Sequence, residues 1–291
     1  MHTLKRTKLA IFAGLLPSLI IYIGIAVVPI AMSLYYSFFD WDGITAKEFV
    51  GLGNFTEMLQ DDIFWLSVKN NVIIMLTGLV GQIPIGLLLA LLLNRSLRGT
   101  SFFRTAGFLP VVISSVMVSL IWGMIYNTEY GFLNSFLSVI GLESWTRNWL
   151  GDPAWSMASI SVAYIWQNCG LYMVIFLAAL QSIPQEVNEA AELDGATGLR
   201  RVLSITIPMI RATILVSVVY SISNSFRVFD LVQILTGGGP AHQTEVMTIY
   251  MYNSAFLSRE FGFGSAVSIL ILLFSLIIIS TINRFGREKD V

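Results

Sequence analysis

Long stretches without a charged side chain constrain the fold of this chain more than any other feature. Runs free of Asp, Glu, Lys and Arg extend over residues 9–39, 70–94, 105–128, 153–185 and 261–283. Each run is longer than the roughly 20 residues that a helix needs to cross about 30 Å of hydrocarbon. These runs alone predict five membrane-spanning helices.

A sixth span is predicted to begin at Ala212 and to reach about Leu235, although it contains Arg227 and Asp230. Both charges fall in its last third, close to one face of the membrane. Only 12% of all residues are charged, which excludes a conventional water-soluble domain. We therefore expect an all-α integral membrane protein whose residues 1–291 form a single transmembrane domain. The six spans are expected at about 9–35, 70–93, 105–127, 157–180, 212–235 and 262–283.

The positions of the basic residues predict the orientation of these spans. Cytoplasmic loops of membrane proteins are enriched in Lys and Arg. With both termini in the cytoplasm, the inner side receives Lys5, Arg6, Lys8, Arg95, Arg98, Arg104, Arg200, Arg201, Arg211, Arg284, Arg287 and Lys289. The outer side receives only Lys47, Lys69, Arg147 and Arg259. This bias predicts that both termini are cytoplasmic.

The sequence offers no recognisable catalytic or cofactor motif. No Walker A, HExxH, GxSxG or dinucleotide fingerprint occurs. Cys169 is the only cysteine, and the two histidines, His2 and His242, are far apart. A net charge of −1 provides no basic field for nucleic acid. We expect no catalytic residue, metal site or cofactor on this chain, so movement of a solute against a gradient would draw on another chain or on an ion gradient.

The connection between the fourth and fifth spans, residues 181–211, is the only long cytoplasmic loop. Pro184 suits the first turn of a helix, and Glu189 favours the helix N-terminal end. Gly195 can adopt the left-handed conformation that ends the helix. Ala190 and Ala191 contribute to a stripe of small residues on one face. The loop therefore predicts a helix of about three turns.

Two interpretations of this helix are open. A stripe of small residues lets another backbone approach closely, and the acidic flank adds a charge signature, which favours docking to a protein. The alternative is an amphipathic helix on the lipid headgroups. Such helices are typically basic with bulky apolar residues, whereas this one is acidic with alanines, so we favour docking.

Several segments of the chain carry a family resemblance. Glu189-Ala190-Ala191 followed by Gly195 and Ile207-Pro208 resembles the EAA loop of permease subunits of bacterial ABC importers, with Ile207 in place of the usual Leu. The extended form, with Asp194-Gly195-Ala196, is similar to the branch that imports oligosaccharides and related polyols. Further matching segments are 49–55, 102–104, 108–110 and 229–240.

The resemblance implies a non-catalytic permease subunit in a bacterial cytoplasmic membrane. Such a subunit forms half of the translocation pathway for a sugar, oligosaccharide or related polyol. Its implied partners are a second permease subunit, two cytoplasmic ATP-binding subunits that hold ATP and Mg²⁺, and an extracytoplasmic solute-binding protein. The residues implied to couple to the ATPase are Glu189, Ala190, Ala191, Asp194, Gly195 and Pro208. The alternative is an ion-coupled secondary transporter without an ATPase, which would call for carboxylates deep in the spans and an inverted repeat.

Polar residues inside the spans are candidates for the substrate path, because placing them in a membrane is unfavourable. The fourth span offers Trp166, Gln167 and Asn168, and the fifth offers Tyr220 and Asn224. At helical spacing, Gln167 and Asn224 are able to face a shared cavity. The other interpretation is that these groups make hydrogen bonds between helices.

Arg227 and Asp230 also have two interpretations. They are three residues apart, so an internal ion pair on one helical face would lower the free energy of placing both near the membrane. Alternatively, they line an outer gate and contact the binding protein or a hydroxyl-rich solute. Pro17, Pro29, Pro84 and Pro110 are able to kink the helices that contain them, although proline is also ordinary in spanning helices.

Overall fold

The computed structural model describes residues 2–94 and 99–287. Arg95, Arg98 and Lys289, three of the basic residues behind the topology prediction, lie outside the described residues. The described residues are mostly helical, as expected, and divide into two compact units. The first unit comprises residues 1–61 and 251–273, and the second comprises residues 62–250 and 274–291.

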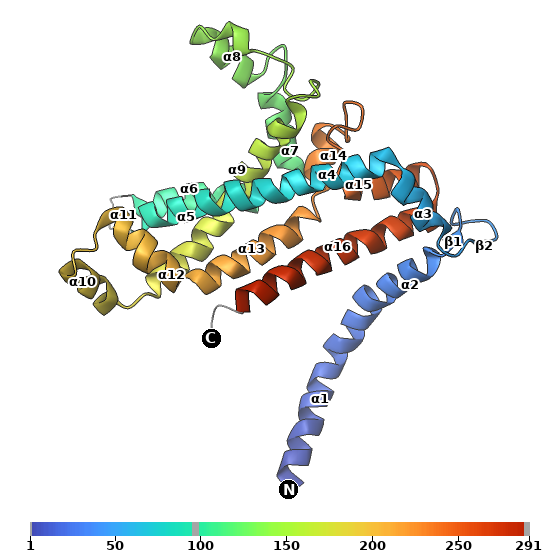
Figure 1. Ribbon diagram of the computed structural model, residues 1–291, viewed down its shortest axis with the longest axis horizontal. Coiled ribbons are helices and arrows are strands. Elements are labelled where there is room, and N and C mark those ends of the chain that lie inside the picture. The colour runs from blue at the N-terminus through green and yellow to red at the C-terminus, as the bar shows by residue number, and fades with distance from the viewer. Residues whose placement is uncertain (1, 95–98, 288–291) are drawn as a thin grey trace. The chain divides into compact units, whose positions relative to one another are not determined.

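The first unit combines a long N-terminal helical segment with a small hairpin (Figure 1). Its elements are α1 (His2–Tyr22), η1 (Ile23–Val27), α2 (Val28–Tyr36), β1 (Phe39–Asp40), β2 (Glu48–Phe49), α3 (Gly53–Gln60), η5 (Asn253–Leu257) and the first part of α16 (Phe261–Arg287). The two strands pair antiparallel, with Phe39 opposite Phe49.

Backbone contacts hold the hairpin of the first unit in place. The buried side chain of Asn54 donates from Nδ2 to the carbonyl oxygens of Ser37 and Phe39, both at 2.9 Å. These bonds tie α3 to the end of α2 and to β1. Gly262 lies against the same strand, because a Cβ atom there would be 1.8 Å from the Phe39 carbonyl oxygen. Only glycine fits at this contact.

The second unit contains most of the helices. Its elements are α4 (Asp62–Thr77), η2 (Gly78–Gln82), α5 (Ile83–Leu93), α6 (Thr100–Val112), α7 (Ser115–Ile125), α8 (Phe132–Val139), η3 (Glu143–Trp145), α9 (Ser156–Gln181), α10 (Gln185–Leu193), α11 (Gly198–Arg201), η4 (Val202–Thr206), α12 (Ile207–Met209), α13 (Arg211–Ser225), α14 (Asp230–Leu235), most of α15 (Met247–Tyr252) and the rest of α16.

The helix α9 lies at the centre of the second unit and packs against both α5 and α6 (Figure 1). Its backbone meets that of α6 directly, since a Cβ atom on Gly170 would lie 2.1 Å from the carbonyl oxygen of Gly107. One apolar cluster, which includes Ile160 and Val232, joins α9 to α7 and α14. A second cluster, which includes Phe176, joins α9 to α5. These contacts hold α9 in place, and α9 forms one wall of the cavity described below.

Three wide π-helical turns come directly before prolines in the spanning helices. The turn η1 precedes Pro29, η2 precedes Pro84 and η4 precedes Pro208. In each turn, the residue before the proline donates its N–H to the carbonyl five residues earlier, as Ile83 does to Gly78. Proline lacks an N–H and its ring clashes with the preceding turn. The wider turn keeps these helices continuous.

Four helical segments are long and apolar enough to cross a membrane: Gly14–Tyr36, Asp62–Leu93, Ser156–Gln181 and Phe261–Ile282. Two bent helix pairs bring the number to as many as six, if each pair counts as one span. In the first, α6 and α7 meet at 101°, so the span expected over 105–127 is bent. In the second, the 198–209 and 211–225 segments meet at 73°.

The expected continuous span over 212–235 is wrong, because α13 ends at Ser225 and a separate helix, α14, begins at Asp230. Partners from distant segments satisfy carbonyl groups of this break. Asn71 Nδ2 donates to the Ser225 carbonyl at 3.2 Å, and Thr248 Oγ1 donates to the Val228 carbonyl at 2.6 Å. A helix can end inside a membrane protein where such partners replace its own hydrogen bonds.

Candidate functional site

A polar cavity of about 410 Å³ lies where two helix breaks of the second unit face α9. We call it the polar cavity. One break separates α6 from α7, and the other separates α13 from α14. Its lining residues are 111–115, Tyr164, Gln167, Asn168, Leu171, Tyr220, Asn224 and 227–231.

The α9 wall of the cavity carries amide and hydroxyl groups on one helical face. Tyr164, Gln167, Asn168 and Leu171 follow the spacing of a single face. Gln167 is only 8% exposed, and its Nε2 donates to Ser115 Oγ at 3.1 Å. Asn168 Nδ2 donates to the Tyr164 carbonyl of its own helix at 3.0 Å. Gln167 therefore joins α9 to the first turn of α7.

The α13 wall contributes Tyr220 and Asn224, which are four residues apart. Asn224 Nδ2 approaches the hydroxyl oxygen of Tyr164 at 3.5 Å, at the limit of a hydrogen bond. The buried Gln82 side chain donates to the Tyr164 carbonyl at 2.9 Å, which holds this part of α9 against η2. Gln167 and Asn224 thus line the same cavity, as helical spacing suggests. Each also makes a contact between helices, so both sequence interpretations describe part of the geometry.

Arg227 and Asp230 both line the polar cavity, and both are exposed. They do not share a helical face, because Arg227 lies in the break and Asp230 begins α14. Within the described residues, no ion pair joins them. The ion-pair interpretation is therefore wrong, and two oppositely charged groups remain available at the cavity.

Trp166 does not line the polar cavity, unlike the other four substrate-path candidates. Neighbouring helical residues point about 100° apart, and Trp166 instead meets Trp122 edge to face, with ring centroids 5.8 Å apart. The sequence reasoning also missed the lining segment 111–115. Ser114 gave a signal there, because serine is a preferred N-cap and its Oγ accepts the N–H of Met117.

The 181–211 loop forms the expected short helix, α10, which begins after Pro184. Gly195 adopts the predicted left-handed conformation, with a φ of 71°. Its N–H donates to the Glu192 carbonyl at 3.1 Å, and the N–H of Ala196 donates to the Ala191 carbonyl at 2.8 Å. These bonds satisfy the last carbonyls of the helix, as expected for a glycine-ended helix.

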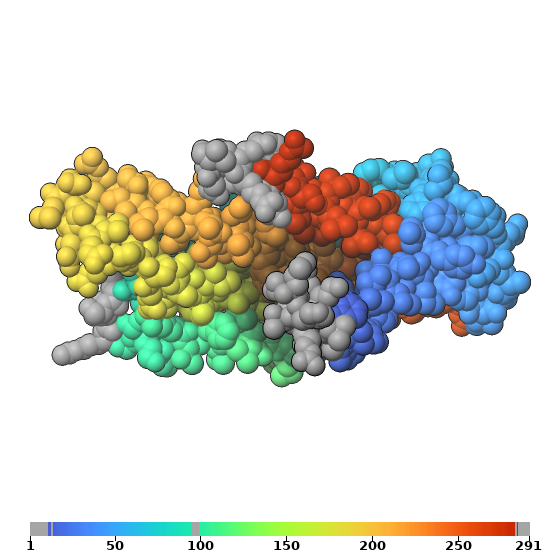
Figure 2. Space-filling view, turned by 90° about the horizontal axis from the view of Figure 1, so that it is seen from below, coloured from blue at the N-terminus to red at the C-terminus, as the bar shows by residue number. Residues whose placement is uncertain are grey.

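One face of α10 is uncovered. Glu186, Glu189, Ala190 and Leu193 follow helical spacing, and all four are exposed. Leu193 is 89% exposed, although it is apolar, while Ala191 on the other side is buried. In Figure 2 this yellow segment lies on the surface, with no other part of the chain in front of it. We call these four residues the α10 face; the sequence reasoning had missed Leu193.

The glycine-rich segment at 237–239 forms a turn. Gly237 and Gly238 have φ values of 60° and 89°, in the region that favours glycine. His242 Nδ1 pairs with the carboxylate of the buried Glu245. Asn70 Nδ2 donates to the Glu245 carbonyl at 2.9 Å, which anchors the turn to α4. Within the described residues, no group of His, Cys, Asp and Glu is arranged to hold a metal ion.

The first unit has an acidic hollow of about 280 Å³ beside the hairpin. Asp40, Glu57 and Glu260 line it. Partial burial raises the pKa of the Glu260 carboxyl above its ordinary value, and the two neighbouring carboxylates raise it further.

These features define an integral membrane protein in which bent spans surround a polar cavity and a short helix with an uncovered face lies in a connecting loop. Residues 82–288 match the family of inner membrane components of binding-protein-dependent transport systems, and the chain belongs to this family.

Curated relatives and solved structures cover nearly the whole chain. The probable ABC transporter permease protein YurN of Bacillus subtilis is 36% identical, over 98% of this chain and 99% of the relative. The sulfoquinovosyl glycerol transport system permease protein SmoG of Agrobacterium fabrum is 32% identical, over 95% and 90%. A chain of a bacterial ABC transporter that imports the acidic polysaccharide alginate is 26% identical, with a TM-score of 0.86 and 99% coverage of both chains.

Proposed function

We propose that this chain is a permease subunit of an ATP-driven importer and forms half of the translocation pathway for a sugar, oligosaccharide or related polyol. The observation that carries the proposal is the polar cavity, which gathers Gln167, Asn168, Tyr220 and Asn224 between bent spans. The proposal is also supported by the relatives, whose names include sulfoquinovosyl glycerol transport, and by the likeness to the alginate importer.

The chemistry of the cavity suits a hydroxylated solute. Amide side chains donate and accept hydrogen bonds at once, and so do sugar hydroxyl groups. Tyrosine rings add apolar faces on which the carbon side of a sugar ring packs. Arg227 and Asp230 add one donor group and one acceptor group of opposite charge at the break. The cavity therefore has hydrogen-bond donors, hydrogen-bond acceptors and ring faces. The opposite charges of Arg227 and Asp230 cancel, so together they add no net charge.

The bent helix pairs suit a pathway that changes access. A break leaves backbone groups that bond to partners outside their own helix, as at Ser225 and Val228. Such partners can be exchanged as the helices move, and element-terminal residues are where rigid-body movements are absorbed. We infer that the breaks around the polar cavity are the places where access alternates between the two sides of the membrane.

We further propose that the α10 face docks on a cytoplasmic ATP-binding subunit. Glu186 and Glu189 offer negative charge, Ala190 allows close approach, and Leu193 offers an apolar contact. Closure of the ATPase dimer would move α10 as a rigid body, and the bent 198–225 segment would carry that movement to the cavity. Asp194 and Gly195 set the end of the helix, and Pro208 lies at the bend into α13.

The full transporter would then contain a second permease subunit, two ATP-binding subunits that hold ATP and Mg²⁺, and an extracytoplasmic binding protein. A solved relative is described as a transporter in complex with a periplasmic protein that carries an alginate pentasaccharide. In this proposal both termini and the 181–211 loop face the cytoplasm of a bacterial cell, and the 128–155 connection faces outward.

The test is binding-protein-dependent sugar uptake by the reconstituted transporter. Asn224→Ala and Gln167→Ala are expected to lower uptake strongly while the protein still inserts and the α10 face still docks. Ser223→Ala is the matched control, because its hydroxyl bonds only to the Val219 carbonyl of its own helix and it does not line the cavity. Wild-type uptake by both cavity variants would reject the cavity as the pathway.

A further inference from the structure

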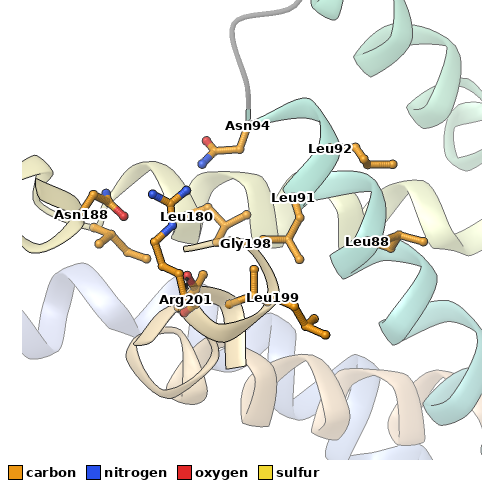
Figure 3. Close-up of a pocket in the computed structure, with 12 residues that line it drawn as sticks. Leu88, Leu91, Leu92, Asn94, Leu180, Asn188, Gly198, Leu199 and Arg201 are labelled. Atoms are coloured by element: carbon orange, nitrogen blue, oxygen red, sulfur yellow. Dashed lines mark hydrogen bonds between the residues drawn. The ribbon is translucent and has the colours of Figure 1, made fainter. Parts of the chain in front are cut away.

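A second cavity, of about 420 Å³, lies between α5, the end of α9 and the α10–α11 segment (Figure 3). Its lining is distinct from that of the polar cavity. One end of this cavity is lined by apolar side chains and the other by polar ones. Leu88 and Leu92 lie toward one end, whereas Asn94, Asn188 and Arg201 gather toward the other. We call it the divided cavity.

The apolar end of the divided cavity is open to the surroundings of the chain. Leu88 and Leu92 are 57% and 48% exposed, and they lie four residues apart on the same face of α5. Both belong to the candidate span Asp62–Leu93, close to its end. Leu199, on the other wall, is 72% exposed. An exposed leucine row at the end of a span is expected to face hydrocarbon near the membrane surface.

The polar end of the divided cavity presents the guanidinium group of Arg201. Arg201 Nη1 donates to Glu192 Oε1 at 3.0 Å, and the other guanidinium donors have no partner among the described residues. This surface ion pair contributes little stability, so it is easily exchanged. A second guanidinium, that of Arg104, donates to the carbonyl oxygen of Leu93, the residue next to Asn94. This end therefore offers guanidinium donors to an anionic group that displaces the Glu192 carboxylate from Arg201.

We propose that the divided cavity binds one anionic phospholipid. Its phosphate bonds to the Arg201 guanidinium and to the Asn94 amide, and an acyl chain runs along Leu88 and Leu92. Guanidinium groups bind phosphate through two parallel hydrogen bonds, and basic pockets at the cytoplasmic ends of spans recognise anionic headgroups.

Such a lipid would act on the connection that follows α10. Gly198, Arg201 and Thr206 all line the divided cavity, and they lie between α10 and the bend into α13. A bound lipid holds these residues against α5 and reduces their freedom. In this respect the inference builds on the proposed coupling role of the loop, but lipid binding itself is measured independently of transport.

The experiment is native mass spectrometry of the complete transporter, released from nanodiscs of phosphatidylcholine with about one-fifth phosphatidylglycerol. Arg201→Gln is expected to lower the phosphatidylglycerol retained per complex by about threefold or more, because a charge-assisted bond is lost. Arg200→Gln is the matched control: it removes the same charge from the adjacent, exposed residue, which does not line the cavity. Its retention is expected to equal that of the wild type.

A second variant, Leu91→Trp, fills the cavity while keeping every charge, and it is expected to lose the lipid as well. Equal retention in the wild type and Arg201→Gln would overturn the proposal, and so would equal loss in Arg200→Gln, which indicates attraction to charge alone. Displacement of the lipid by millimolar inorganic phosphate would identify a free-anion site instead. Retention of the lipid only in complexes that have lost their ATP-binding subunits would overturn the proposal, because it would show that a protein surface fills the cavity in the complete transporter.

Discussion

Gly195 offers a sharp test of the 181–211 loop, because its backbone conformation and its surroundings are both defined. Its φ of 71° lies in the left-handed region, and a Cβ atom built there meets nothing within 4 Å. A side chain at this position therefore has space, and the penalty comes from the backbone alone. For a residue other than glycine that penalty is about 1–2 kcal/mol, and branching at Cβ adds to it.

A strain of this size has a measurable consequence for coupling. A free energy of about 1–2 kcal/mol changes a two-state population roughly 5- to 30-fold. We expect Gly195→Val to lower the ATPase activity stimulated by loaded binding protein by about that factor in proteoliposomes, while the spans still insert. Gly195→Asn is expected to retain most of the stimulation, because asparagine tolerates the left-handed conformation.

The matched control is Gly141→Val in the 128–155 connection. Gly141 has a φ of 79° and equally open surroundings, so the backbone strain is the same in a different place. We expect wild-type stimulation from this variant. Unchanged stimulation in Gly195→Val would refute the coupling role, and equal losses in both variants would show that strain at any loop glycine is enough.

Three further predictions concern other surfaces. Leu193→Ala removes three apolar carbons worth about 0.8 kcal/mol each when buried, so we expect roughly 60-fold weaker binding of the ATP-binding subunit in a pull-down titration. The control Leu257→Ala, at a residue with 68% exposure, is expected to change nothing; equal effects of the two variants would reject the α10 face. Arg227→Met and Asp230→Asn are each expected to lower sugar uptake about tenfold. Neither variant is expected to shift the thermal unfolding temperature, because no ion pair joins Arg227 to Asp230. Normal uptake together with reduced stability would contradict this prediction. The pKa of Glu260 is raised by burial and by nearby carboxylates, so the folded state binds its proton more tightly than the unfolded state and stability falls as pH rises through this titration. Glu260→Gln should therefore raise the melting temperature at pH 7, with a smaller gain below the ordinary carboxyl value of 4.5; a gain that does not depend on pH would contradict the assignment.

The long uncharged runs were sufficient to predict where the chain forms apolar helices, because hydrocarbon requires continuous apolar segments. They were not sufficient to predict the break at residues 226–229. That break depends on Asn71 and Thr248, whose side chains bond carbonyls far away in the sequence. A local sequence pattern carries no information about such distant partners, so it predicts one continuous helix over 212–235.

At the candidate site, too, spacing within one helix was predictable from the sequence, whereas contacts between helices were not. Helical spacing groups Gln167 with Asn168 on one face of α9, and Tyr220 with Asn224 on one face of α13, because the geometry of a single helix fixes which of its residues share a face. That these two faces meet at one cavity depends on how the helices pack, which spacing does not determine. Spacing on one helix did not exclude Trp166, whose contact is with Trp122 on α7. The local signal at Gly195 was the most direct, since few residues other than glycine adopt its backbone conformation.

The most direct test of the account is uptake of labelled sugar into proteoliposomes that contain either this chain alone or the complete transporter. The account predicts accumulation only when the second permease subunit and the ATP-binding subunits are present, with ATP on the side of the α10 face and loaded binding protein on the other side. Accumulation by this chain alone, driven by an ion gradient and without ATP, would contradict it.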